Sequence, residues 1–251
     1  MSFDYSGTRW GSDKVGLSFT YLQALKLRWC LEDLKEVKGR VLEVGCGAGG
    51  MAKAIKRYRP DLEIIGGDVS KEAIKYANKD SQGVKFIQLD AYKLPFKQGS
   101  LGAVVSFDVL EHLDKVKVGL KEVDRVLKPK GVFHNFLPLE GQKGTWYWLL
   151  TKLGWKGKKL AGHVRAYDVK QIVNKLEKNG FKVVRKKYGY HWFFQAIDLL
   201  HYASWSWLKT RPAKRSWFGV FKRIVAPLVN LESWLLAKVP GGGVSLGAVK
   251  K

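Results

Sequence analysis

The glycine-rich segment Gly45–Gly50 restricts the fold of this chain more than any other sequence feature. It follows the short apolar run Arg40–Val44 and precedes a stretch of helical pattern that Pro60 ends. This order predicts a strand, a tight turn and the start of a helix. Glycines let the backbone approach a ligand closely, and the amides at a helix start favour a carboxylate or a phosphate. A tight turn without a ligand is the alternative interpretation.

Further apolar runs follow at the spacing of alternating strands and helices. The runs that predict strands span residues 62–66, 84–90, 101–107 and 131–137. Ser70 is the expected N-cap of a helix that reaches Lys79, and another helix is expected from about Val109. Alternation of this kind predicts a doubly wound α/β fold, in which helices cover both faces of a parallel sheet.

Length and composition restrict the class of protein. The 251 residues suit one α/β domain, 1–251, better than two independent cores. A hydrophobic share of 46% excludes a disordered chain, and a charged share of 27% excludes a polytopic membrane protein. Two cysteines, Cys30 and Cys46, are too few for a disulfide framework or a cysteine-rich zinc site. Because the N-terminus also lacks the pattern of a secretory leader, we expect a cytoplasmic protein.

Acidic, glycine and serine residues fall where the predicted strands end. They are Glu43, Gly45, Gly47, Asp68, Asp90 and Ser106. The carboxyl ends of parallel strands meet at one edge of the sheet, which is where α/β proteins bind ligands. A carboxylate at the end of the second strand, here Asp68, typically accepts hydrogen bonds from the two hydroxyls of a ribose.

The glycine spacing alone does not identify the ligand, because Gly45-x-Gly47-x-x-Gly50 also fits the pattern of proteins that bind a dinucleotide. Glu43 argues against a dinucleotide, since a carboxylate there would repel a pyrophosphate but could hold an amino group. Asp90 with Ala91 offers an acceptor for an adenine amino group and a small residue beside the ring. A ligand with ribose, adenine, an α-amino group and a carboxylate is S-adenosylmethionine.

Five motifs in order resemble those of the class I S-adenosylmethionine-dependent methyltransferases, and within them the small-molecule type 11 group. They are VLEVGCGAGG, GGDVS, LDAYKLPF, SFDVLEHL and EVDRVLKPKG. The segment GHVRAYDVKQIVNKLEKNGFKVV is similar to the later helix and sixth strand of that group, so the resemblance covers residues 37 to about 184. It implies a Rossmann-like, seven-stranded doubly wound sheet, with strands six and seven at 181–187 and 243–250. The cofactor-binding core is expected at 37–137.

The resemblance also implies roles for individual residues, with S-adenosylmethionine as the methyl donor. Glu43 and the backbone at Gly45, Gly47 and Gly49 would hold the methionine part. The remaining cofactor contacts would come from Asp68 at the ribose, Val69, Asp90 and Ala91 at the adenine, and Ser106 and Phe107 beside the methionine.

Two histidines are the predicted catalytic residues, because an alcohol, phenol or amide acceptor needs a base. His112 follows the fourth strand, His163 precedes the helix expected near Asp168, and Asp108 and Glu111 are nearby candidates. A structural hydrogen bond is the plain alternative for each histidine, and His134 within strand five is expected to be a core residue.

The string Asp108-x-x-Glu111-His112 also resembles the metal-binding string of ubiquinone O-methyltransferases, which have Glu where this chain has Asp108. Acidic residues at a helix start more often complement the helix dipole. No metal ligand is therefore assigned from the sequence.

Positive charge and tryptophan concentrate in the second half of the chain. Of 45 basic and 22 acidic residues, which give a net charge of +23, residues 1–135 hold 23 and 17, and residues 136–251 hold 22 and 5. Eight of the ten tryptophans also follow Asn135. The sequence therefore divides into a nearly ordinary first half and a basic, aromatic second half.

The excess falls in two insertions that follow predicted strands five and six, at 138–167 and 188–242. The second contains two apolar stripes at helical spacing: Phe193, Ile197, Leu200 and Trp207, then Trp217, Phe221, Ile224, Leu228, Leu231 and Leu235. Polar residues lie on the other faces of these helices: Asp198, Lys222, Arg223 and Asn230. Pro227 is expected to kink the second helix. Basic runs occur at 156–159 and 210–215. Since both insertions leave the carboxyl ends of parallel strands, they are predicted to form a lid over the methyl acceptor.

An aromatic, basic lid favours a small lipophilic acceptor, such as a quinone precursor or a lipid-linked metabolite, and an anionic membrane surface as a partner. Neither stripe is an uncharged run long enough to span a bilayer, so surface association is expected. Packing of the stripes on each other and on the sheet is the alternative. An RNA methyltransferase and a non-catalytic cofactor-binding partner subunit remain the alternative functions. The sequence does not indicate an oligomeric state.

Overall fold

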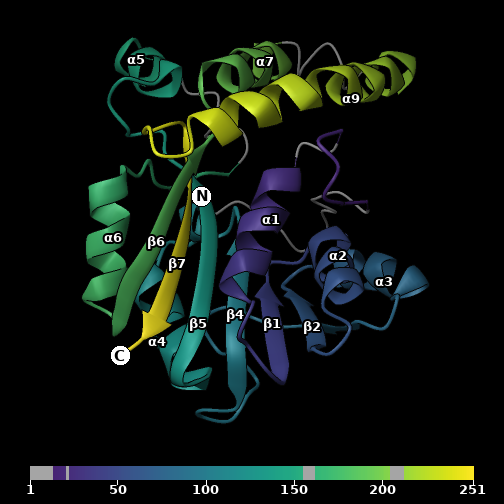
Figure 1. Ribbon diagram of the computed structural model, residues 1–251, viewed down its shortest axis with the longest axis vertical. Helices are drawn as coiled ribbons and strands as arrows, with labels where there is room; N and C mark the ends of the chain where they lie inside the picture. The colour runs from purple at the N-terminus through teal and green to yellow at the C-terminus, as the bar shows by residue number, and fades with distance from the viewer. Residues whose placement is uncertain (1–13, 21–22, 155–161, 204–211) are drawn as a thin grey trace.

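The computed structural model describes residues 14–20, 23–154, 162–203 and 212–251, and for 201–203 and 212–223 it describes the backbone alone. Its sheet has seven strands in the order β3-β2-β1-β4-β5-β7-β6 (Figure 1). The strands are β1 Arg40–Val44, β2 Glu63–Asp68, β3 Lys85–Gln88, β4 Leu101–Phe107, β5 Leu127–Pro138, β6 Phe181–Gly189 and β7 Gly243–Lys250. The predicted Rossmann-like sheet is confirmed.

Strand direction places the ligand-binding edge. β1 pairs in parallel with both β2 and β4, and β4 pairs in parallel with β5. β7 lies antiparallel between β5 and β6, as expected for the last strand. The chain order reverses between β1 and β4, and in open parallel sheets the crevice beyond the carboxyl ends at such a point is where ligands bind.

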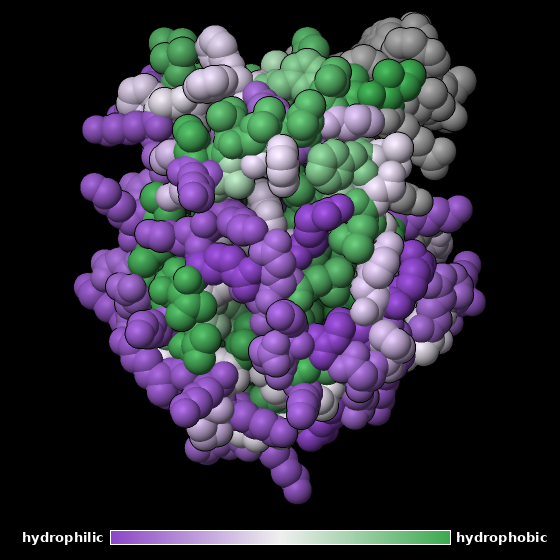
Figure 2. Space-filling view, viewed as in Figure 1, coloured by the Kyte–Doolittle hydropathy of each residue, from purple (hydrophilic) through white to green (hydrophobic). Residues whose placement is uncertain are grey.

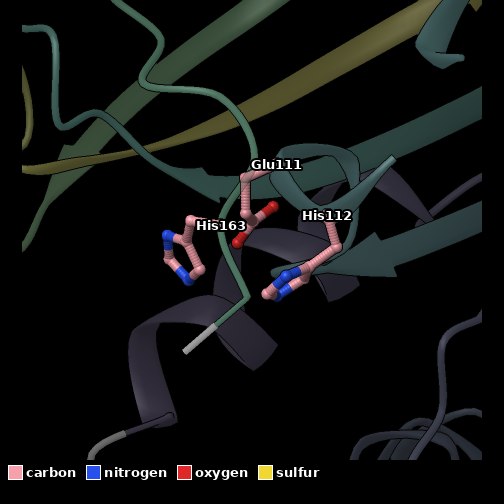
Figure 3. Close-up of side chains that lie close together, drawn as sticks. All are labelled: Glu111, His112 and His163. Atoms are coloured by element: carbon pink, nitrogen blue, oxygen red, sulfur yellow. The ribbon is translucent and has the colours of Figure 1, made fainter. Parts of the chain in front are cut away.

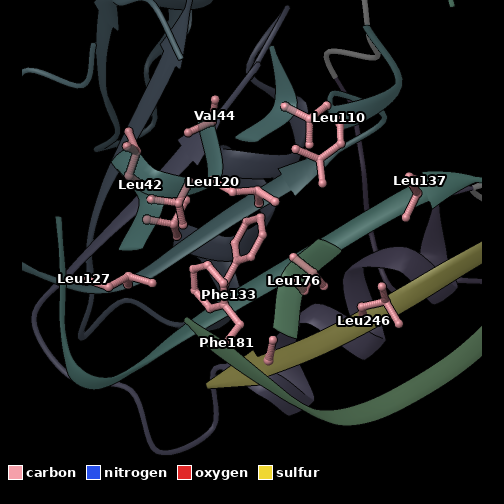
Figure 4. Packing of buried hydrophobic residues seen from close by; sticks show 14 of the residues in the cluster. Leu42, Val44, Leu110, Leu120, Leu127, Phe133, Leu137, Leu176, Phe181 and Leu246 are labelled. Carbon is pink, nitrogen blue, oxygen red and sulfur yellow. The ribbon is translucent and has the colours of Figure 1, made fainter. Parts of the chain in front are cut away.

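Helices cover both faces of the sheet and bury two separate apolar clusters. On one face lie α1 Ala24–Asp33, α2 Gly50–Tyr58 and α3 Lys71–Ala77, and on the other α4 Val116–Val126 and α6 Val169–Glu177. Neighbouring residues of β1 supply both clusters, since Val41 belongs to the first and Leu42 to the second. The cluster beneath α4 and α6 is centred on Phe133, Phe181 and surrounding leucines (Figure 4). This burial fixes the carboxyl ends of the parallel strands at one edge.

Two helices begin where the sequence predicts. The Ser70 side chain accepts a hydrogen bond from the Ala73 backbone N–H, and α3 continues as a short 3₁₀ helix, η1 Asn78–Asp80. Asp168 begins α6 with a capping box that it forms with Gln171. Local side-chain chemistry therefore sets both helix boundaries where the sequence placed them.

One predicted helix is wrong at its start. In place of a helix from about Val109, the chain forms a 3₁₀ turn, η2 Leu110–His112, and α4 begins only at Val116. Asp108 has a positive φ of 56° and Leu113 is extended, so neither can continue an α-helix. β5 also begins earlier than predicted, at Leu127, and passes through the Pro129–Gly131 segment.

The insertions contain α5 Trp146–Lys152, α7 Trp192–Ala203 and α9 Pro212–Leu235, the last of which continues through Pro227. All three lie beyond the carboxyl ends of the parallel strands (Figure 1). We refer to them as the lid helices. Several residues singled out in the sequence fall outside the described part or have undescribed side chains: 156–159, Trp205, Trp207, 210–215, Trp217, Phe221, Lys222 and Arg223.

The described part of the α9 stripe faces outward. Ile224, Leu228, Leu231 and Leu235 are exposed, with 69%, 56%, 44% and 65% of their surface accessible. The opposite face, with Val225, Ala226, Val229, Asn230 and Ser233, is buried. Packing of this stripe on the sheet, the alternative interpretation, is therefore wrong for its described residues. Within the described ranges, no helix combines the length and the apolar character needed to cross a bilayer.

Candidate active site

The glycine turn after β1 is shaped so that only glycine fits at two positions. Gly45 and Gly49 have φ values of 75° and 80°. A Cβ at Gly45 would lie 2.4 Å from Val109, and one at Gly49 would lie 2.6 Å from Phe86. The turn therefore brings bare backbone to the start of α2, as a site for an anionic ligand group requires.

The acid at the end of β2 is bound to this turn. One carboxylate oxygen of Asp68 accepts the Gly47 N–H at 2.8 Å, and the other accepts the Ser70 N–H at 2.9 Å. The Gly45 and Cys46 amides donate to the Gly67 carbonyl at 2.7 and 3.0 Å. Each carboxylate oxygen of Asp68 retains acceptor capacity, so the side chain can still receive the two hydroxyls of a ribose.

Glu43 lies beneath the glycine turn. It is buried, and in the described structure its Oε2 atom has no hydrogen-bond partner. Burial raises the pKa of Glu43 well above its usual value, and the negative charge of Asp68 adds to that increase. A buried acid with an orphaned oxygen is suited to receive a cationic amino group, which is the role that the sequence predicts.

The predicted adenine contacts lie at the edge formed by β2 and β3. Val69 follows β2 with 48% of its surface exposed, and its carbonyl accepts a hydrogen bond from Gln88. Asp90 accepts the Tyr92 N–H at 2.8 Å, which fixes the carboxylate next to Ala91. An exposed apolar side chain beside an oriented carboxylate can pack on a purine and accept its amino group.

Ser106 and Phe107 are less available than the sequence suggests. Ser106 is buried and donates its hydroxyl proton to Asn135 at 2.7 Å, so its side chain is committed to the neighbouring strand. The Phe107 ring packs against His134 at 5.4 Å between centroids. His134, fully buried, pairs with Asp33 at 2.6 Å and is a core histidine as expected. Ser106 and Phe107 can contribute backbone groups to a ligand more readily than side chains.

A buried lysine of α1 contacts the chain directly after β4, on the side of the sheet edge where the acceptor is expected. Lys26 of α1 forms an ion pair with Asp108, and its ammonium lies 4.1 Å from the Phe136 ring centre and 4.9 Å from that of Tyr190. Sequence reasoning did not identify Lys26. Its position in the sequence could have indicated it, because Lys26 lies between Leu25 and Leu27, which are both buried.

Both predicted catalytic histidines come together around Glu111 (Figure 3). The rings of His112 and His163 meet edge-on, 4.8 Å apart between centroids and at 86°. His112 Nδ1 lies 3.1 Å from the Gly162 carbonyl, and His163 Nδ1 lies 2.5 Å from the Glu140 carboxylate. We refer to Glu111, His112 and His163 as the acceptor-side cluster.

Burial favours the neutral forms of two members of this cluster, Glu111 and His112. Glu111 is fully buried without a hydrogen bond to either carboxylate oxygen in the described structure, and burial, followed by the charge of Asp108, raises its pKa well above the usual value. Burial and then His163 lower the pKa of His112, so its imidazole is neutral near pH 7. A neutral imidazole can accept a proton or bind a metal.

Glu140 is the second residue that sequence reasoning missed. It is buried and fixes the ring of His163, although the two are 23 residues apart. The sequence could have indicated Glu140, because acidic residues are rare in the second half of the chain: residues 136–251 contain only five.

Comparison with known proteins gives consistent matches. A methyltransferase domain family matches residues 42–134. Demethylmenaquinone methyltransferase of Thermotoga maritima is 33% identical over 162 residues, which cover 57% of this chain and 70% of the relative. Sterol 24-C-methyltransferase ERG6B of Gibberella zeae is 34% identical over 120 residues, covering 45% of this chain and only 29% of that protein. The crystal structure of a Bacillus halodurans protein described as a methyltransferase superposes with a TM-score of 0.59 at 18% identity, covering 90% of this chain and 99% of that one.

Proposed function

Because the chain belongs to the type 11 group of the class I S-adenosylmethionine-dependent methyltransferases, we propose that it methylates a small lipophilic acceptor. The observation that carries the acceptor class is the exposed apolar face of α9, which lies beyond the edge of the sheet where the acceptor must enter. The relatives named for demethylmenaquinone and sterol methylation act on molecules of the same chemical class.

S-adenosylmethionine supplies an electrophilic methyl group on a sulfonium when it is bound. In the proposed site, the turn at Gly45–Gly49 and Glu43 hold its methionine part, Asp68 accepts its ribose hydroxyls, and Val69 with Asp90 and Ala91 frames its adenine. The orphaned Glu43 oxygen and the left-handed backbone of the glycine turn at Gly45 and Gly49 both fit this ligand. The main catalytic contribution of such a site is alignment of the acceptor with the methyl group.

The acceptor-side cluster is placed to handle the proton of the acceptor. We infer that His112 or His163 takes the proton that an acceptor hydroxyl or acidic C–H loses as its bond to the methyl group forms. Glu140 supports this role because it holds His163 Nδ1, which leaves Nε2 as the ring nitrogen that can take a proton. A base oriented by a carboxylate is an arrangement that many general-base sites share.

The lid helices support association with an anionic membrane surface. Apolar side chains gather across the upper part of the face in Figure 2, where α9 lies. Lys152 at the end of α5 and Lys238 after α9 are exposed, and each basic residue near an anionic bilayer contributes about 1 kcal/mol. An apolar helix face flanked by lysines is typical of proteins that lie on a bilayer and take substrates from it.

Lipid and metabolite profiling of a deletion strain tests this proposal. We expect loss of one methylated lipophilic compound and accumulation of its precursor lighter by one methyl group. Unchanged lipids together with loss of a methylated RNA nucleoside would support the RNA alternative. Copurification of a second, catalytic methyltransferase subunit with this chain would support a non-catalytic role.

A further inference from the structure

The acceptor-side cluster has the composition of a metal site. Glu111, His112 and His163 each offer one ligand atom, and these three atoms lie within 4.8 Å of one another. Figure 3 shows the Glu111 carboxylate between the two imidazole rings. We propose that this cluster binds one divalent transition-metal ion, a site that the family assignment does not include.

The Glu111 carboxylate is the first argument. It is fully buried, and neither oxygen has a hydrogen-bond partner in the part of the chain that the structure describes. Buried carboxylates are normally hydrogen-bonded, ion-paired or bound to a metal. A cation between Glu111 and the histidines would supply the missing partner for this carboxylate, whereas Lys26 is already paired with Asp108.

The outer contacts of the histidines are the second argument. His112 and His163 each place Nδ1 against an oxygen, the Gly162 carbonyl and the Glu140 carboxylate. In that arrangement Nδ1–H donates to the oxygen, and Nε2 is the atom that can coordinate. Metal-bound histidines usually have such an outer carbonyl or carboxylate, which fixes the tautomer and the ring orientation.

The donor set indicates the class of metal. Two imidazole nitrogens and one carboxylate suit zinc and neighbouring transition metals, while magnesium and calcium prefer oxygen ligands. Three protein ligands also leave a coordination position open, as catalytic metal sites do. If the proposed function holds, a bound metal would lower the pKa of an acceptor hydroxyl so that its proton is lost to water, and His112 and His163 would then be ligands in place of the base inferred above.

The geometry separates this site from the sequence string Asp108-x-x-Glu111-His112. Asp108 is held by Lys26 of α1 and does not belong to the group that lies within 4.8 Å. The third ligand is His163, which lies in the segment after β5 and is 51 residues from His112. The two sets of ligands predict different effects of substitution.

The test is titration of the chelator-treated protein, free of any histidine tag, with Co²⁺ followed by visible absorbance, and then displacement by Zn²⁺. We expect one equivalent of Co²⁺ to bind with the absorbance of a site of low coordination number. His163→Gln and His112→Gln should weaken binding at least about 100-fold, and Glu140→Gln about 10- to 100-fold. Asp108→Asn removes a neighbouring charge but no proposed ligand, so it should weaken binding far less than His163→Gln does.

Either of two results would overturn the proposal: no stoichiometric binding of Co²⁺ or Zn²⁺ by the unaltered protein, or equal affinity in His163→Gln. Circular dichroism and thermal unfolding check that each variant folds, and Glu140→Gln keeps the test decisive if a ligand variant does not. The titration needs neither S-adenosylmethionine nor an acceptor. Failure to find a lipophilic acceptor would therefore leave its result unaffected.

Discussion

The carboxylate of Asp68 accepts a hydrogen bond from the backbone N–H of Gly47, which lies 21 residues earlier in the chain. The end of β2 and the glycine turn after β1 are thereby one rigid unit, since Ser70 holds the second oxygen of the same carboxylate. Asp68 is oriented before any ligand arrives. Pre-orientation of this kind lowers the entropic cost of binding.

Asp68→Ala should weaken binding of S-adenosylmethionine at least about 100-fold, because hydrogen bonds to a charged group contribute about 1.5–3 kcal/mol each. Asp68→Asn, which can still accept the Gly47 N–H, should lose less. Isothermal titration calorimetry measures both. The matched control is Asp61→Asn, an exposed acid paired with Arg59, which should bind as the unaltered protein does. Unchanged affinity in Asp68→Ala would refute the ribose assignment.

Glu43→Gln should separate stability from cofactor binding. Burial raises the pKa of Glu43, so folding takes up a proton at neutral pH, and the unliganded protein loses stability as pH rises above the unfolded value of about 4.3. Glu43→Gln removes this cost. Thermal unfolding should show the variant more stable than the unaltered protein at about pH 8 and equal to it at about pH 4.

The same substitution should weaken binding of S-adenosylmethionine, because an amide cannot neutralise the amino group of the ligand. Calorimetry in buffers of different ionisation enthalpy should show proton release on binding by the unaltered protein and none by Glu43→Gln. Equal proton release in the two proteins would contradict the role of Glu43.

Lys26→Met should affect the acceptor and spare the cofactor. Methionine keeps the packing on Phe136 but leaves the charge of Asp108 without its partner. The charge of Asp108 already raises the pKa of Glu111 next to it. We expect the rate of methyl transfer to a membrane-lipid fraction to fall at least about tenfold, which corresponds to a change of about 1.4 kcal/mol at the acceptor side. The affinity for S-adenosylmethionine should not change. Lys250→Met, which alters a lysine–aspartate pair on β7, is the matched control.

The outer face of α9 should be needed for membrane binding. Leu228→Glu with Leu231→Glu places two charges on the exposed face and should abolish co-sedimentation with anionic vesicles, because a charged face cannot enter the apolar layer. Val118→Glu on α4 is the matched control, since Val118 is also exposed but lies away from the lid helices. Binding by the unaltered protein should decrease with salt. Absence of binding at low salt would exclude the membrane partner.

The sequence predicted the features that depend on local chemistry. Asp68 and the glycine turn are recognisable because a strand end, a turn and a helix start follow one another within a few residues. The Ser70 cap and the helix start near Asp168 are likewise local, and both helices begin as expected. The alternation of strands and helices, together with the family resemblance, likewise predicted the seven-stranded doubly wound sheet.

Features that depend on distant pairs were not predictable. Lys26 meets Asp108 across 82 residues and Glu140 meets His163 through a loop, and no local spacing encodes either contact. The orientation of α9 is a third case. Periodicity identifies its apolar stripe, but the buried face includes Asn230, which donates to the Phe19 carbonyl and the Ala226 carbonyl. Which face packs inward depends on that tertiary contact and on the rest of the chain.

The most direct test of the central claim is transfer of a labelled methyl group from S-adenosylmethionine to a cell extract that has been separated into lipid, RNA and aqueous fractions. The structure predicts label in the lipid fraction with the unaltered protein and none with Asp68→Ala. Label confined to RNA or to water-soluble metabolites, at any salt concentration, would contradict a lipophilic acceptor.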